Sequence, residues 1–143
     1  MIEEFVKAWN HNKATLEEYF KTTEMGEYSD YNTLVKLLFE KVINPYRKTL
    51  KYKEPYDLTR LHVIDDGDYQ GTIIYLIPES WFHPNSFDYV WTCVEYGSCS
   101  ACDTIKGICE GDEDELPNEQ QLKNFMTLCL HLLQHCKKLD TKE

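Results

Sequence analysis

The fold is decided by residues 61–78, which read LHVIDDGDYQGTIIYLIP. Two apolar, β-branched runs flank an Asp-Gly pair, and this pattern is a strong short-range signal for a β-hairpin. Pro78 is expected to stop the second strand, because proline cannot donate to a strand ladder. Residues 87–96 are rich in aromatic and β-branched side chains and end at Gly97, which predicts a third strand. These runs together predict a three-stranded antiparallel sheet.

Helical periodicity precedes the sheet. Apolar residues at i, i+3, i+4 and i+7 predict a short amphipathic helix over residues 2–9, which the polar residues 10–12 interrupt. Thr15, with a glutamate three positions later, has the capping-box pattern of a second helix start. A longer helix is predicted from about Asp30, and Pro45 is expected to end it.

Two more helices are predicted after the sheet. Residues 98–105 are expected to begin a short helix with Ser98 as its cap. Asn118, with a glutamine three positions later, opens the last helix, whose inner face is expected to reach Leu139. We therefore expect residues 1–143 to form one α+β domain: N-terminal helices, a three-stranded antiparallel sheet, a short helix after a Cys-x-x-Cys pair, and a long C-terminal helix across the sheet.

The composition and the first residues of the chain indicate where in the cell the protein is located. Of the 143 residues, 42% are apolar and 13% aromatic, which suits a folded core and is unlike a disordered chain. No apolar run approaches the ~18 residues of a membrane-spanning helix. The first residues lack the basic start and unbroken apolar stretch of a signal peptide. We therefore expect a cytoplasmic location.

The net charge of −10 indicates which classes of binding partner are compatible with the chain. Binding to a phosphate backbone needs clustered lysine and arginine, so we do not expect nucleic acid as a direct partner. Residues 45–59 are a local exception, because basic side chains alternate there with tyrosines. That pattern fits either a surface for single-stranded nucleic acid or a connector whose tyrosines pack on the domain. The overall negative charge fits either the ordinary acidity of a soluble protein, which is the better supported interpretation, or contact with a basic partner.

Chemistry is concentrated in a Cys-x-x-Cys pair, Cys99 and Cys102, at the predicted strand-to-helix junction. The chain holds six cysteines, and in a reducing compartment these are core residues, metal ligands or redox groups. Cys129 and Cys136 fall near the centre of the apolar face of the last helix, which favours packing. A redox interpretation takes Cys99 as the nucleophile and Cys102 as the resolving thiol.

A metal site is the other interpretation of this pair. Zinc needs about four ligands, and His131 and His135 are four positions apart, so they project from one face of the last helix. The hypothesis is a zinc site formed by Cys99, Cys102, His131 and His135. It would staple the short helix to the terminal one.

Two groups of carboxylates are further candidates. The first gathers at the hairpin turn and beside the Cys-x-x-Cys pair, as a functional cluster or a Mg²⁺ or Ca²⁺ site, with turn chemistry as the alternative. Its members are Asp65, Asp66, Asp68 and Asp103. The second is an acidic run that is either a solvated loop or a contact for a basic partner. Its members are Asp112, Glu113, Asp114 and Glu115.

Three stretches carry a resemblance to known sequences: residues 62–72, residues 126–134, and residues 96–104 with their motif Tyr-Gly-Ser-Cys-x-x-Cys-Asp. On these residues the chain resembles a family of small uncharacterised proteins from phages and prophages. The resemblance implies a phage accessory or early gene product, located in the host cytoplasm if phage-encoded. The resemblance does not indicate any particular activity.

Our functional expectation joins these observations. We expect a non-catalytic binding module that acts on a host or phage protein, with a structural metal site as an added feature. The alternative is a small thiol-redox or metal-dependent enzyme that uses Cys99 and Cys102.

Overall fold

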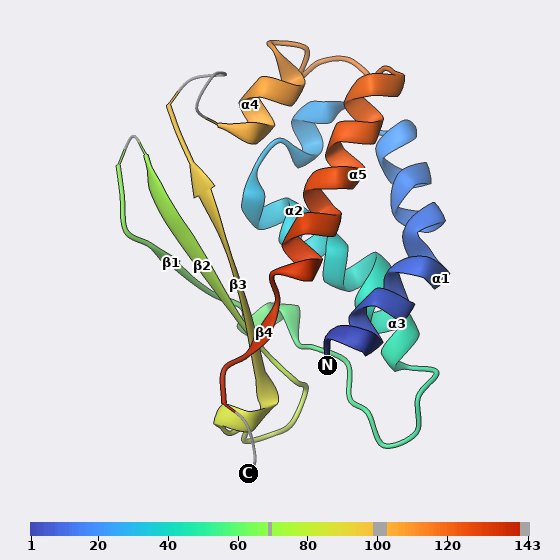
Figure 1. Cartoon of the computed structure of the whole chain (residues 1–143), viewed down its shortest axis with the longest axis vertical. Helices are drawn as coiled ribbons and strands as arrows, with labels where there is room; N and C mark the ends of the chain where they lie inside the picture. Colours follow the sequence, from blue (N-terminus) through green and yellow to red (C-terminus); the bar gives the residue numbers. More distant parts are fainter. Residues whose placement is uncertain (69, 99–102, 141–143) are drawn as a thin grey trace.

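The computed structural model describes residues 1–68, 70–98 and 103–140. All labelled helices lie on one side of the sheet (Figure 1). The α-helices are α1 (Ile2–Lys21), α2 (Tyr31–Leu38), α3 (Asn44–Arg47), α4 (Thr104–Cys109) and α5 (Glu119–Gln134). The strands are β1 (His62–Asp65), β2 (Gly71–Pro78), β3 (Tyr89–Tyr96) and β4 (Lys137–Lys138). Within the described ranges, no helix has the length and apolarity to cross a membrane.

The first predicted helix pair is a single helix, α1. Its buried residues include Phe5 and Leu16, which lie on either side of the polar residues 10–12. The predicted break fails because those polar residues are tolerated on the partly exposed side. The side-chain amide of Asn12 donates to the carbonyl oxygen of Val42 at 3.0 Å. The predicted helix start at Thr15 is therefore also wrong.

The next helix begins as predicted but does not end at Pro45. Asp30 caps α2 by accepting a hydrogen bond from the backbone of Thr33 at 2.8 Å. The chain then makes a π-helical turn over Phe39–Ile43 and continues into α3, which contains Pro45. A π turn changes the hydrogen-bonding register of the helix. Proline is also tolerated in the first turn of a helical segment, where its missing N–H has no partner to lose.

The sheet has four antiparallel strands in the order β1-β2-β3-β4, one more than predicted. The predicted hairpin is confirmed as β1 and β2, with His62 opposite Leu76. The last helix ends at Gln134 rather than near Leu139. Beyond it, β4 pairs with β3, and the Leu139 amide donates to the carbonyl of Tyr89 at 3.0 Å. Two lysines have no strand pattern, so only the pairing with β3 could reveal this strand.

The core lies between the sheet and the helices. Alternate residues of β2 face the helical layer and are buried: Ile73, Tyr75 and Ile77. The helices contribute Phe20 and Phe125, whose rings lie 5.6 Å apart. Among the residues that the structure describes, no labelled helix covers the opposite face of the sheet (Figure 1).

Candidate functional site

Asp103 organises the end of the predicted Cys-x-x-Cys junction. Its side chain is buried and is the N-cap of α4, the role that the sequence had indicated for Ser98. One carboxylate oxygen accepts hydrogen bonds from the Tyr31 hydroxyl at 2.9 Å and the Lys106 amide at 3.2 Å. The other oxygen accepts from the Gly97 amide at 3.0 Å. Asp103 therefore joins β3, α2 and α4 at one point.

A cavity of about 310 Å³ lies beside this junction. Its polar lining includes Asp30, Asp65, Tyr96, Asp103 and Lys106. Two members of the predicted carboxylate cluster, Asp65 and Asp103, thus face one cavity although they are far apart in sequence. The other two, Asp66 and Asp68, do not line it.

The hairpin carboxylates also show turn chemistry. Asp65 accepts hydrogen bonds from the Gly67 amide at 3.1 Å and from the Tyr96 hydroxyl at 2.6 Å. Asp66 accepts from the Thr72 amide at 2.7 Å. Such bonds satisfy backbone donors where the chain bends. In the part of the chain that the structure describes, no three or more histidine, cysteine, aspartate or glutamate side chains are placed to hold a metal ion.

The Tyr96–Asp65 hydrogen bond gives a testable pH effect. It lowers the pKa of Asp65 below the ordinary 3.8, with a smaller contribution from the Gly67 amide, and raises the pKa of Tyr96 to about 12. A lowered carboxyl pKa means that the stabilising contribution is present above the ordinary pKa and is lost as the pH falls through the folded value. We expect Tyr96→Phe to raise the pKa of Asp65 toward its ordinary value, measured by a carbon-detected NMR titration. Tyr89→Phe is the control, and an unchanged pKa in Tyr96→Phe would contradict the assignment.

The predicted metal ligands are only partly described. His131 and His135 are exposed on α5, with ring centroids 6.5 Å apart. Both line a second cavity of about 330 Å³ together with Cys93 and Thr104. Cys99 and Cys102 lie outside the described residues, so the zinc and redox hypotheses stay predictions.

Three of the other cysteines, Cys109, Cys129 and Cys136, are buried packing residues. Cys129 and Cys136 are buried as predicted, and burial raises the pKa of each thiol to about 12. Burial likewise raises the pKa of Cys109 to about 11. At neutral pH these three thiols stay protonated, and a protonated thiol is a poor nucleophile.

The acidic run forms a loop whose backbone is held in place. The Gly26 amide donates to the carbonyl of Glu113 at 2.7 Å, and the Met25 amide donates to the carbonyl of Glu115 at 3.0 Å. A Cβ at Gly26 would lie 3.0 Å from the same Glu113 oxygen, so a side chain there would push the loop away. Asp112 accepts a bond from Gln121 at 3.3 Å, while the other three carboxylates are exposed.

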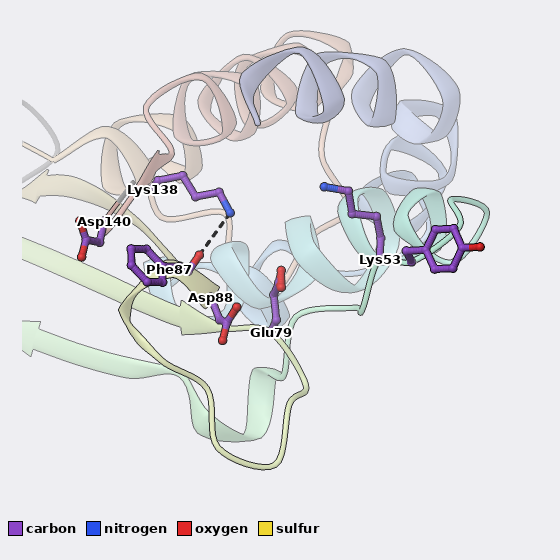
Figure 2. Close-up of a pocket in the computed structure, with 7 residues that line it drawn as sticks. Lys53, Glu79, Phe87, Asp88, Lys138 and Asp140 are labelled. Atoms are coloured by element: carbon purple, nitrogen blue, oxygen red, sulfur yellow. Dashed lines mark hydrogen bonds between the residues drawn. The ribbon is translucent and has the colours of Figure 1, made fainter. Parts of the chain in front are cut away.

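The basic residues of the connector over residues 45–59 do not all lie at the surface. Arg47 is buried, while Tyr52 is 98% exposed. Figure 2 shows the amino groups of Lys53 and Lys138 directed toward the same space, with the carboxylates of Glu79 and Asp88 close by. This pocket of about 340 Å³ has mixed charge, which disfavours the nucleic-acid interpretation.

The uncovered face of the sheet is a feature that the sequence interpretation missed. Side chains alternate across a strand, so the neighbours of the buried β2 residues point away from the helices. The pairing places these residues in two rows across the sheet. The rows are Ile64–Ile74–Cys93 and His62–Leu76–Trp91–Lys137. We call these residues, with Tyr89 and Leu139, the outer face.

The outer face is apolar and contoured. Ile64 is 50% exposed and Leu139 is 45% exposed. A shallow hollow of about 370 Å³ lies among the side chains of β1, Leu76, Tyr89 and Leu139. The amino group of Lys137 lies 5.7 Å from the centre of the Trp91 ring at one margin. The sequence signal was the unbroken apolar run in β2, which indicates burial on both faces of a strand rather than one.

Comparison of the chain with protein-family models, curated proteins and solved structures finds no match. The resemblance to phage proteins therefore stays a prediction.

Proposed function

We propose that this chain is a non-catalytic binding module that docks a partner protein on the outer face of its sheet. The observation that carries the proposal is an apolar face, containing Ile74, Leu76 and Trp91, with no helical layer over it among the described residues. Contiguous exposed apolar surface marks interaction sites. Tryptophan and tyrosine are the side chains most enriched in the energetic centres of interfaces.

The charge of the chain indicates the kind of partner. A net charge of −10 opposes nucleic acid, and it also opposes close approach of a second copy. A basic protein would be steered toward the chain, and the exposed carboxylates of Glu113, Asp114 and Glu115 would contribute to this attraction. In the phage interpretation, this partner is a host or phage protein.

A charge placed in the outer face tests the proposal. Leu76→Glu puts a carboxylate at the centre of one row, whereas Phe82→Glu makes the same change at a loop residue that is 89% exposed. We expect the parent chain and Phe82→Glu to capture the same protein. The affinity of that purified protein for Leu76→Glu should be about tenfold or more lower than for the parent chain. The measurement is quantitative capture followed by titration with the purified partner.

Two results would contradict the proposal. One is equal affinity of the partner for the parent chain and for a folded Leu76→Glu variant, with folding checked by urea denaturation. The other is a dimer of the parent chain in light scattering that Leu76→Glu dissociates. That dimer would make the outer face an interface between copies of this chain.

A further inference from the structure

One edge of the sheet is only half paired. Strand β3 runs from Tyr89 to Tyr96, but β4 pairs only with its residues Val90 and Trp91. The residues that precede β4 belong to α5, which ends at Gln134, so they do not continue the strand along β3. Along the second half of β3, the described part of the chain supplies no strand on this side.

The backbone geometry shows which groups are left over. The carbonyl of Tyr89 accepts from Leu139, so the N–H and C=O of every second residue from Tyr89 point to the β4 side. Those of Cys93 and Glu95 therefore point to the unpaired edge, and no described residue forms a backbone hydrogen bond with them there. The intervening residues point to β2. A row of unpaired backbone donors and acceptors is a template for another strand.

The side chains beside this edge form a groove. It is the cavity of about 330 Å³ that lies between β3 and α5. Its apolar lining includes Leu128 and Leu132, and the imidazoles of His131 and His135 lie on the α5 side. Glu95 is the one carboxylate among the lining residues of this groove.

We infer that the unpaired edge of β3 takes an extended peptide segment of a partner protein, antiparallel to β3 and in line with β4. Its backbone would bond to the N–H and C=O groups of Cys93 and Glu95. One apolar side chain would enter the groove between β3 and α5. This is strand addition, in which the main chain supplies affinity and the pocket supplies specificity.

The unpaired backbone groups of β3 indicate which kind of ligand fits this edge. Backbone donors and acceptors at every second residue match an extended strand, whose own groups repeat at that spacing, and not a helix, whose groups bond internally. Leu128 and Leu132 line the groove beside the edge, which suits an apolar side chain of such a segment. The inference rests on the proposed function in one respect, that the ligand is a protein.

Proline at position 95 tests the inference. The N–H of Glu95 points to the open edge, so Glu95→Pro removes one donor there without removing a bond to β2. Glu95→Ala removes the same carboxylate but keeps the N–H. The probe is a fluorescent seven-residue peptide selected with the parent chain from a random library. We expect Glu95→Ala to bind it like the parent, and Glu95→Pro to bind it about tenfold more weakly, the loss of roughly one hydrogen bond.

The peptide itself supplies a second measurement that needs no protein variant. Methylating a peptide amide that faces β3 should abolish binding, and methylating the next amide along should not, because alternate amides face opposite sides. Failure to select any peptide overturns the inference, as does equal binding of peptides methylated at either position. Dimerisation of the parent chain that Glu95→Pro abolishes also overturns it, in favour of a second copy. If Leu76→Glu releases the partner while Glu95→Pro changes neither partner nor peptide binding, the inference fails and the proposed function stands.

Discussion

Replacing Arg47 with alanine is expected to lower the free energy of unfolding by about 3–5 kcal/mol. The Arg47 guanidinium is 2% exposed and bonds to Glu4 at 2.8 Å and to Glu79 at 2.9 Å. It also donates to the carbonyl of Glu54 at 2.6 Å and lies 4.4 Å from the centre of the Tyr56 ring. Its removal takes the guanidinium from two largely buried carboxylates and leaves Glu4 with only the amino group of Lys53 at 3.7 Å, which costs much more than the intact pair contributes.

Urea denaturation measures this loss, and Arg60→Ala is the matched control. Arg60 also bonds to a carboxylate, Asp57, at 2.7 Å, but the Arg60 side chain is 36% exposed. An exposed pair contributes about 0–1 kcal/mol, and Arg60 also donates to the carbonyl of Trp81 at 2.7 Å, so the control is expected to lower stability less than Arg47→Ala does. Equal effects of the two substitutions would show that burial does not strengthen the Arg47 cluster. Replacing Glu4 and Glu79 with glutamine in the Arg47→Ala background should recover part of the loss, because no charged carboxylate then remains at these two largely buried positions.

Arg47 also shows where interpretation of the sequence reaches its limit. Its neighbours Lys48, Lys51 and Lys53 are exposed basic residues, and local pattern cannot separate an arginine that points inward from lysines that point outward. The carboxylates that bind it come from α1 and from the end of β2, 43 and 32 residues away. Burial of a charge depends on such distant partners, which no local signal encodes.

Local signals did predict the elements whose determinants are local. The hairpin and the start of α2 were correct, because a turn and a cap are each decided within a few residues. The start of α5 at Asn118 was correct for the same reason: Asn118 and Gln121 form both hydrogen bonds of a capping box, each side chain accepting from the backbone N–H of the other residue. Two elements were not predicted because they depend on distant contacts. Strand β4 depends on pairing with β3, and the continuous helix α1 is supported by a hydrogen bond from Asn12 to Val42.

The candidate sites divide in the same way. The sequence indicated Asp65 and Asp103 as members of one cluster, and both line the same cavity. It did not indicate the outer face, because the period-two alternation of a half-covered strand is absent from the apolar run in β2. The unpaired edge at Cys93 and Glu95 was also out of reach, since it exists only because β4 is short.

Replacing Asp103 with alanine is expected to lower the free energy of unfolding by about 3 kcal/mol, the second large effect. The substitution removes the cap of α4 and leaves the Tyr31 hydroxyl and the Gly97 amide without their acceptor in a buried place. Asp57→Ala is the control, because Asp57 caps the short 3₁₀ helix Leu58–Arg60 near the surface, where water replaces the lost bond. An equal loss in both variants would contradict the role of burial.

Two further measurements separate the roles that Asp103 combines. Tyr31→Phe removes one donor and should cost about 1 kcal/mol, and its effect should shrink in the Asp103→Ala background, where the hydroxyl has already lost its acceptor. Amide exchange of Gly97 should quicken in Asp103→Ala but not in Tyr31→Phe, because only the first substitution removes the acceptor of that amide. If Gly97 exchange is unchanged in Asp103→Ala, then Asp103 does not hold the end of β3.

The cavity beside Asp103 and the unpaired edge of β3 meet at this point in the chain. A loosened β3 end would therefore weaken peptide binding at Glu95 without any change in the groove itself.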